Sequence, residues 1–212
     1  MIRAYQETYL SKAQAALGDA FDYAVNTCHI SGSDFISLFT ASTVSRRFGN
    51  GEPIYIAGKS GIEIAIDVVL ETTGKLLEYE PKEQYRRSAE YWIGWAVCYY
   101  QWFSRRSFDE IFEVLSFKDL KRMYTTLHEA DISKFAEIAD AKLREHFQDT
   151  RLKRLRSYYG FTQAELARRS GVSLRSIQMY EQRNKDINKA SAETLYSIAT
   201  VLGCRMEDLI EK

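Results

Sequence analysis

The residues between Thr162 and Glu181 carry side chains whose chemistry suits a nucleic acid. The guanidinium of Arg175 can donate two hydrogen bonds to O6 and N7 of one guanine, which discriminates against a wrong base by about 1–3 kcal/mol. The amide of Gln163, beside the backbone N–H groups of a helix N-terminus, can hold an anion such as phosphate. Gln178 can read adenine or bind a phosphate. These roles require that the surrounding segment present the side chains to solvent.

The segment is predicted to form two short helices joined by a tight turn. Thr162 and Glu165 have the spacing of a capping box, so the first helix begins at residue 163. Gly171 supplies the positive φ that the turn needs, and Ser173 caps the second helix. A helix-turn-helix reads DNA with its second helix in the major groove. On that helix the inward positions are Ile177, Tyr180 and Glu181, and the outward positions are Leu174, Arg175, Gln178 and Met179.

On these residues, the segment from about Thr150 onward resembles the helix-turn-helix family of the phage lambda and phage 434 repressors, also called the Xre or Cro type. The resemblance covers roughly the last third of the chain and implies a five-helix DNA-binding domain over residues 150–212. Apolar residues at helical spacing on both sides of the motif complete such a bundle: Leu152, Leu155, Leu195, Ile198, Ala199, Leu202, Met206, Leu209 and Ile210.

The resemblance also implies roles for single residues. Gln163 occupies the position that binds a DNA phosphate in the family, and Leu174, Arg175 and Met179 occupy base-reading positions. Leu174 and Met179 depart from the polar residues common there and offer only apolar contact, for instance to a thymine methyl group. Arg175 is therefore the strongest candidate for reading a base. The full set of expected DNA contacts is Gln163, Ser173, Leu174, Arg175, Ser176, Gln178, Met179, Arg183 and Lys185.

Arg156 and Glu181 match a pair that forms an internal salt bridge in the family. We interpret the pair as structural, because the carboxylate of Glu181 would repel a phosphate. A substitution at Arg156 is therefore expected mainly to lower stability.

The formal net charge of zero hides two unlike parts of the chain. Residues 151–212 hold 12 Lys or Arg against 7 Asp or Glu, whereas residues 1–150 hold 17 against 22. Within 151–189 the balance is 10 against 3, so positive charge is concentrated where phosphate would be met.

Composition predicts two domains in 212 residues, at 1–149 and 150–212. Neither a membrane span nor the apolar run of a signal peptide is present in the sequence, so we expect a cytoplasmic protein. Three cysteines far apart, Cys28, Cys98 and Cys204, favour buried free thiols over disulfides or a metal site. No cofactor is expected.

Residues 1–149 show mostly helical spacing and are predicted to be all-α. We expect helices ending near His29, Gly49 and Gly74, a loop from residue 50 to residue 60, and a long helix between Tyr85 and Phe103. Further helices are expected at 107–115, 116–124 and 131–147.

The loop contains Gly58, Lys59 and Ser60, which resemble the end of a phosphate-binding loop. That loop also needs a glycine where this chain has Pro53, so nucleotide hydrolysis is not expected. A bound anion at the helix start stays open. No set of acid, base and nucleophile emerges, and we expect no enzyme.

The long helix carries all three tryptophans of the chain. Its aromatic residues cover much of the circumference, which favours a position at the centre of the core. An exposed aromatic surface for a protein partner is the alternative. The residues concerned are Trp92, Trp95, Tyr99 and Trp102.

Together these observations predict a sequence-specific transcriptional regulator, a repressor of its own operon, that binds double-stranded operator DNA as a homodimer. One alternative is the antitoxin of a toxin–antitoxin pair whose N-terminal domain binds a toxin; the layout and the short segment YIAGKSGIE resemble such regulators. Another is an interaction protein without DNA binding.

Overall fold

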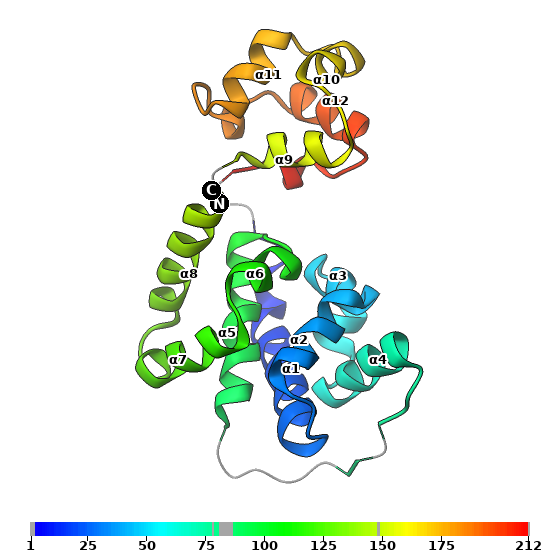
Figure 1. Ribbon diagram of the computed structural model, residues 1–212, viewed down its shortest axis with the longest axis vertical. Helices are drawn as coiled ribbons and strands as arrows, with labels where there is room; N and C mark the ends of the chain where they lie inside the picture. Colours follow the sequence, from blue (N-terminus) through cyan, green and yellow to red (C-terminus); the bar gives the residue numbers. More distant parts are fainter. Residues whose placement is uncertain (1–2, 78, 81–86, 148, 212) are drawn as a thin grey trace. The chain divides into compact units, whose positions relative to one another are not determined.

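The computed structural model describes residues 3–77, 79–80, 87–147 and 149–211. Every regular element in these ranges is a helix, and none of their residues lies in a β-strand, so the predicted all-α fold is confirmed (Figure 1). The chain divides into two compact units, Met1–Leu143 (unit 1) and Arg144–Lys212 (unit 2). This division falls within the last helix of unit 1, whereas the sequence placed the boundary between residues 149 and 150.

In unit 1 a serine begins each of the helices α2 to α7, and its side-chain oxygen accepts the backbone N–H three residues later. Two of the short elements are single π-helical turns, η2 and η3. In chain order the elements are η1 (Glu7–Tyr9), α1 (Leu10–Asp22), η2 (Tyr23–Thr27), α2 (Gly32–Ala41), α3 (Thr43–Gly49), η3 (Ile54–Gly58), α4 (Gly61–Thr73), α5 (Ala89–Ser104), α6 (Phe108–Val114), α7 (Phe117–Leu127) and α8 (Ile132–His146).

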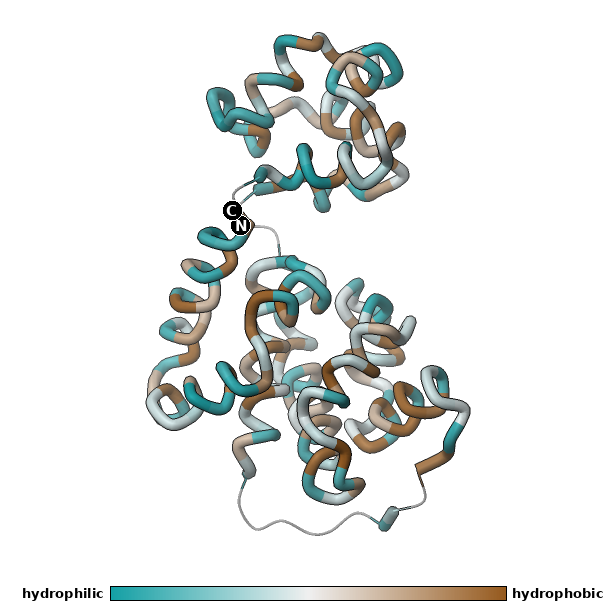
Figure 2. Tube along the Cα trace, viewed as in Figure 1, coloured by the Kyte–Doolittle hydropathy of each residue, from teal (hydrophilic) through white to brown (hydrophobic). Residues whose placement is uncertain are grey.

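The core of unit 1 is built around the close packing of α1 against α4 and α5. A Cβ at Gly61 or at Gly94 would lie closer than 3.0 Å to the backbone of α1, so only glycine fits at these two crossings. Phe21 on α1 then meets Phe35 at 5.0 Å between ring centroids, in an edge-to-face contact. Apolar residues recur along these helices at helical spacing (Figure 2).

One predicted helix of unit 1 is in fact two. The segment up to Gly49 was expected to be a single helix, but Ser42 has extended backbone angles and separates α2 from α3. The Ser42 side chain caps α3 and also donates to the carbonyl of Phe39 at 2.7 Å. The predicted loop 50–60 likewise contains the turn η3, and the predicted start of the long helix at Tyr85 lies outside the described residues.

The favoured position of the long helix in the core is confirmed, and the alternative of an aromatic partner surface is wrong for two of its four residues. Trp92 is 8% exposed and packs against Phe135 of α8 at 5.5 Å between centroids. Trp102 is 4% exposed, and its indole N–H donates to the carbonyl of Tyr5 at 2.9 Å. Trp95 and Tyr99 are half-buried. The long helix α5 is thus a central core element.

The resemblance to a phosphate-binding loop has a structural explanation. The Lys59 ammonium donates to the carboxylate of Asp67 in the second turn of α4. The Ser60 hydroxyl and Glu63 form a reciprocal capping box at the start of the same helix. The Lys59 ammonium and the Ser60 hydroxyl, which would contact an anion, therefore already have carboxylate partners.

Unit 2 is a bundle of α9 (Arg151–Tyr158), α10 (Gln163–Ser170), α11 (Leu174–Glu181), η4 (Ile187–Lys189), α12 (Ala192–Leu202) and η5 (Met206–Leu209). The last of the five expected helices is thus a 3₁₀ turn. Gly171 and Gly203 have positive φ and end α10 and α12. The buried core of the bundle comprises Leu152, Leu166, Ala167, Ile177, Tyr180, Ile187, Leu195, Ile198, Ala199, Leu202 and Leu209.

Candidate nucleic-acid interface

The first turns of α10 and α11 are each defined by local hydrogen bonds. The Thr162 side chain accepts the N–H of Glu165 at 3.1 Å, and the Glu165 carboxylate accepts the N–H of Thr162 at 2.8 Å. The Thr162 hydroxyl also donates to this carboxylate at 2.8 Å. The bonds donated by the N–H and the hydroxyl of Thr162 lower the pKa of Glu165, since they favour its ionised form. At the start of α11 the Ser173 side chain accepts the N–H of Ser176 at 3.1 Å. Both helices therefore begin at the residues that the sequence predicted.

The outer face of α11 carries the predicted base-reading residues. Leu174 is 40% exposed and Arg175 is exposed, while Gln178 and Met179 are half-buried. The opposite face places Ile177 in the core with 0% exposure. An exposed leucine beside an exposed arginine gives the N-terminal end of this helix one apolar and one guanidinium group for the edges of bases.

The two serines at the start of α11 bond to each other. The Ser173 hydroxyl donates to the Ser176 hydroxyl at 2.9 Å, in addition to accepting its backbone N–H. This arrangement fixes the first turn of the helix and therefore the direction in which Arg175 leaves it. Their role as DNA contacts stays a prediction.

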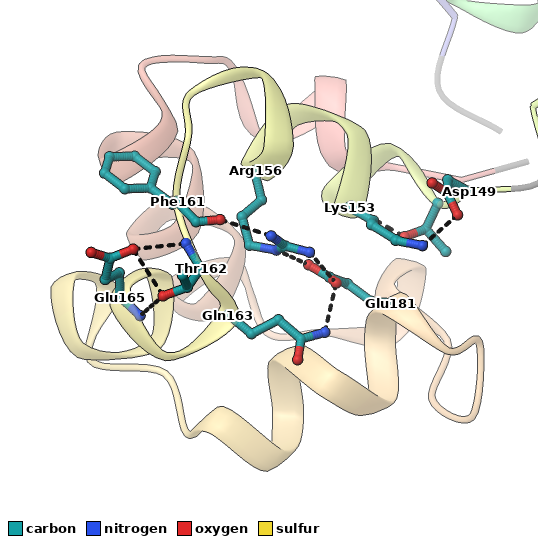
Figure 3. A network of polar contacts seen from close by, with 9 residues as sticks. Asp149, Lys153, Arg156, Phe161, Thr162, Gln163, Glu165 and Glu181 are labelled. Carbon is teal, nitrogen blue, oxygen red and sulfur yellow. Dashed lines mark hydrogen bonds and ion pairs between the residues drawn. The ribbon is translucent and has the colours of Figure 1, made fainter.

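A buried carboxylate connects three helices of unit 2. The Glu181 side chain is 2% exposed and receives two hydrogen bonds from the Arg156 guanidinium, Nε to Oε1 at 2.6 Å and Nη2 to Oε2 at 2.9 Å. The remaining Nη1 of Arg156 donates to the carbonyl of Phe161 at 2.7 Å (Figure 3). This bidentate geometry is the strong form of an ion pair, and the hydrogen bonds that the guanidinium donates to Glu181 raise the pKa of Arg156. The internal salt bridge expected from the resemblance is present.

Gln163 joins the same network. Its amide Nε2 donates to Oε2 of Glu181 at 2.8 Å, as Figure 3 shows. A glutamine amide has two N–H groups, and this bond occupies one of them. The side chain that was predicted to bind a phosphate is thus held in a fixed orientation at the first residue of α10.

A comparison with protein-family models finds that residues 152–209 match the helix-turn-helix family. Residues 152–209 form a helix-turn-helix domain. The match extends from α9 to η5 and includes every element of the bundle. This is a family of DNA-binding regulators, so the resemblance of the last third of the chain to the Xre type is confirmed. Searches of curated proteins and of solved structures gave no significant match.

The loop after α11 extends the basic surface of the helix-turn-helix domain. Arg183 has a φ of +58°, a left-handed conformation that favours glycine. Its guanidinium lies 3.7 Å from the carboxylate of Glu211. Lys185 places its ammonium 5.1 Å from the centre of the Tyr180 ring, and its backbone N–H donates to the carbonyl of Met179. Both side chains are exposed, and both stay predicted DNA contacts.

Sequence reasoning gave no role to Glu211 or Asn188 of the helix-turn-helix domain. They are 23 residues apart and bond to each other, and no local pattern connects positions so distant in the chain.

Among the described residues no three His, Cys, Asp or Glu side chains gather as metal ligands would. In the same ranges no helix has the length and apolar character that crossing a membrane requires.

Proposed function

We propose that this protein is a sequence-specific transcriptional regulator that represses its own operon by placing α11 of the helix-turn-helix domain in the major groove of operator DNA. The observation that carries the proposal is the exposed outer face of α11, with Leu174 and Arg175 at its start, on a helix anchored by the buried Glu181. Arg175 reads a guanine, and Leu174 contacts an apolar group such as the methyl of thymine.

Phosphate contacts surround this face in the proposal. Gln163 at the start of α10 binds one phosphate, and Arg183 and Lys185 in the loop after α11 bind others. The excess of 10 basic over 3 acidic residues within 151–189 supports this arrangement. Each phosphate that is neutralised releases counterions, so affinity falls as salt rises.

The protein acts as a homodimer in this proposal. The recognition helix α11 has eight residues and a length of about 12 Å, which spans only about 3–4 base pairs. So short a site recurs by chance throughout a genome. Two helix-turn-helix domains about 34 Å apart on a near-palindromic operator read twice as many base pairs and become selective.

A shift assay on the DNA upstream of the protein's own gene tests the proposal. The expected result is binding at least about a thousandfold tighter than to a random duplex of the same length, weakening steeply with salt. The control is the full-length Arg175→Ala protein, which should lose preference for one base pair. Equal binding to both duplexes by the wild-type protein would refute sequence-specific regulation.

We further propose that unit 1 binds a protein partner, which would make this chain the antitoxin of a toxin–antitoxin pair. Large apolar side chains on and after η3 and α4 support this second proposal. Their exposed fractions are 50% for Ile54, 45% for Leu70, 58% for Leu76 and 51% for Tyr79. Trp92 and Trp102 contribute to the core instead.

Co-expression with the product of the neighbouring gene tests the second proposal. We expect a stable complex that survives gel filtration and is lost in the Leu70→Asp/Leu76→Asp protein. Unchanged tryptophan fluorescence serves as the folding control, because Trp92, Trp95 and Trp102 belong to unit 1, and the helix-turn-helix domain should still bind operator DNA in that variant. Absence of any complex with the wild-type protein would contradict the antitoxin role and leave the regulator proposal standing.

A further inference from the structure

Glu211 connects three separate segments of the helix-turn-helix domain. Its carboxylate accepts the backbone N–H of Arg151, the first residue of α9, and lies 3.7 Å from the guanidinium of Arg183. Its backbone pairs with the side chain of Asn188, because the Asn188 Nδ2 donates to the Glu211 carbonyl at 2.6 Å and the Glu211 N–H donates to Oδ1 at 2.8 Å. The residue thus contacts the start of the domain and the loop that follows α11.

Glu211 contacts the loop that follows the recognition helix α11, and this loop carries basic side chains. In the loop from Gln182 to Lys189, Arg183 has a left-handed conformation. The loop also contains Lys185, and Asn188 lies at its far end in η4. A loop with one strained residue populates other conformations unless its surroundings fix it. The double hydrogen bond between Asn188 and the backbone of Glu211 provides such a restraint.

We propose that Asn188 and Glu211 are positioning residues for DNA binding: they form a clamp that holds the loop 182–189 against the domain so that Arg183 and Lys185 meet phosphates. The inference rests on the proposed regulator function. The clamp has two separable parts, the two hydrogen bonds between the Asn188 side chain and the backbone of Glu211, and the carboxylate charge of Glu211 near Arg183.

The two parts act on DNA binding with opposite sign. The bonds from Asn188 are short and order the loop before DNA arrives, so they favour binding. The ion pair is long, and the two side chains are 56% and 23% exposed, which leaves it little stabilising value. Its negative charge beside Arg183 instead reduces the attraction of that side chain to a phosphate.

Three full-length variants separate these effects in a titration with operator DNA at several salt concentrations. Asn188→Ala should bind about three- to tenfold more weakly, because the loop loses two hydrogen bonds. Glu211→Gln keeps the backbone bonds and removes the charge, so it should bind about two- to fivefold more tightly, with a steeper salt dependence. Asp208→Asn is the matched control: it removes one charge from the same segment, where Asp208 pairs with Arg205.

A coupling measurement distinguishes positioning from general stability. If Asn188 acts through Arg183, the two substitutions should not be additive. The loss of affinity in the Asn188→Ala/Arg183→Ala protein should be at least twofold smaller than the two single losses combined. Full additivity would overturn the inference, as would equal affinities of Glu211→Gln and Asp208→Asn. A wild-type protein that fails to bind its operator would refute the regulator function itself, whereas normal wild-type binding with unaltered variants would refute only the clamp.

Discussion

Replacing Arg156 by methionine should destabilise the helix-turn-helix domain far more than removing an exposed ion pair of the same domain. The substitution leaves the Glu181 carboxylate, 2% exposed, with the amide of Gln163 as its remaining described side-chain donor. Breaking a buried pair by removing one partner costs about 3–5 kcal/mol. The bond from Gln163 and the 13% exposure of the Arg156 side chain offset part of this, so we expect about 2–4 kcal/mol.

Lys153→Met is the matched control. Lys153 lies on the same helix α9 and pairs with Asp149 at 2.7 Å, but the two side chains are 42% and 52% exposed. Such a pair four residues apart contributes about 0.3–0.5 kcal/mol. For a domain of this size a loss of 1 kcal/mol lowers Tm by about 4–8 °C, so Arg156→Met should lower it by about 8 °C or more and Lys153→Met by about 4 °C or less.

The two units can be followed separately in the full-length protein, because Trp92, Trp95 and Trp102 all belong to unit 1. Tryptophan fluorescence therefore reports the unfolding of unit 1, and hydrogen exchange of peptides from α9 to α11 reports the helix-turn-helix domain. We expect the second signal to shift and the first to stay unchanged. A similarly small shift of the second signal in Arg156→Met and Lys153→Met would refute the reasoning. The Arg156→Met/Glu181→Met protein has no unpaired buried carboxylate and should be more stable than Arg156→Met; if it is not, the reasoning is also refuted.

Four further outcomes are expected. Arg183→Gly should stabilise the domain by about 0.5–1 kcal/mol in urea titrations, because glycine relieves the left-handed strain, and it should reduce the salt slope of DNA binding by about one. Gly61→Ala should cost unit 1 about 1–3 kcal/mol or more, seen by tryptophan fluorescence, since its Cβ would overlap the carbonyl of Ala16. Because folding lowers the pKa of Glu165, its carboxylate stabilises the domain at pH values above the usual carboxyl pKa, and this stabilisation is lost as pH falls through the lowered pKa. In thermal melts, Glu165→Gln should therefore reduce the fall of Tm at acid pH. Arg175→Ala should reduce operator preference at one base pair in shift assays and leave Tm unchanged, whereas equal weakening on all duplexes would make Arg175 a phosphate contact.

The parts of the fold that the sequence predicted are those determined within three or four residues along the chain. Thr162 and Glu165 form the predicted capping box in the structure, and Gly74 ends α4 in the left-handed conformation. A capping box needs only its own two side chains and the first turn of its helix. Such signals therefore identify helix ends without knowledge of the rest of the fold.

What the sequence did not predict depends on contacts between distant residues. The capping role of Ser42 could not be separated from an ordinary helical serine, because the apolar spacing continues on both sides of it. Trp92 and Trp95 both fit the apolar spacing of one helix, so the spacing does not tell which is more buried. Trp92 is buried because it packs against Phe135 of another helix. The partner of Asn188 lies 23 residues away.

The proposed base contact and the proposed phosphate contact are positioned by different means. Gln163 is oriented by a carboxylate that also receives the guanidinium of Arg156, so its geometry is fixed by the buried network that stabilises the domain. Arg175 is exposed, and it depends on the serine-capped first turn of α11 for its direction. Stability and phosphate binding should therefore change together when Glu181 is altered, whereas base preference can vary on the surface of α11 at little cost to the fold. An exposed leucine at position 174 fits this division, because an apolar side chain there alters which base edge is favoured without disturbing the core beneath it.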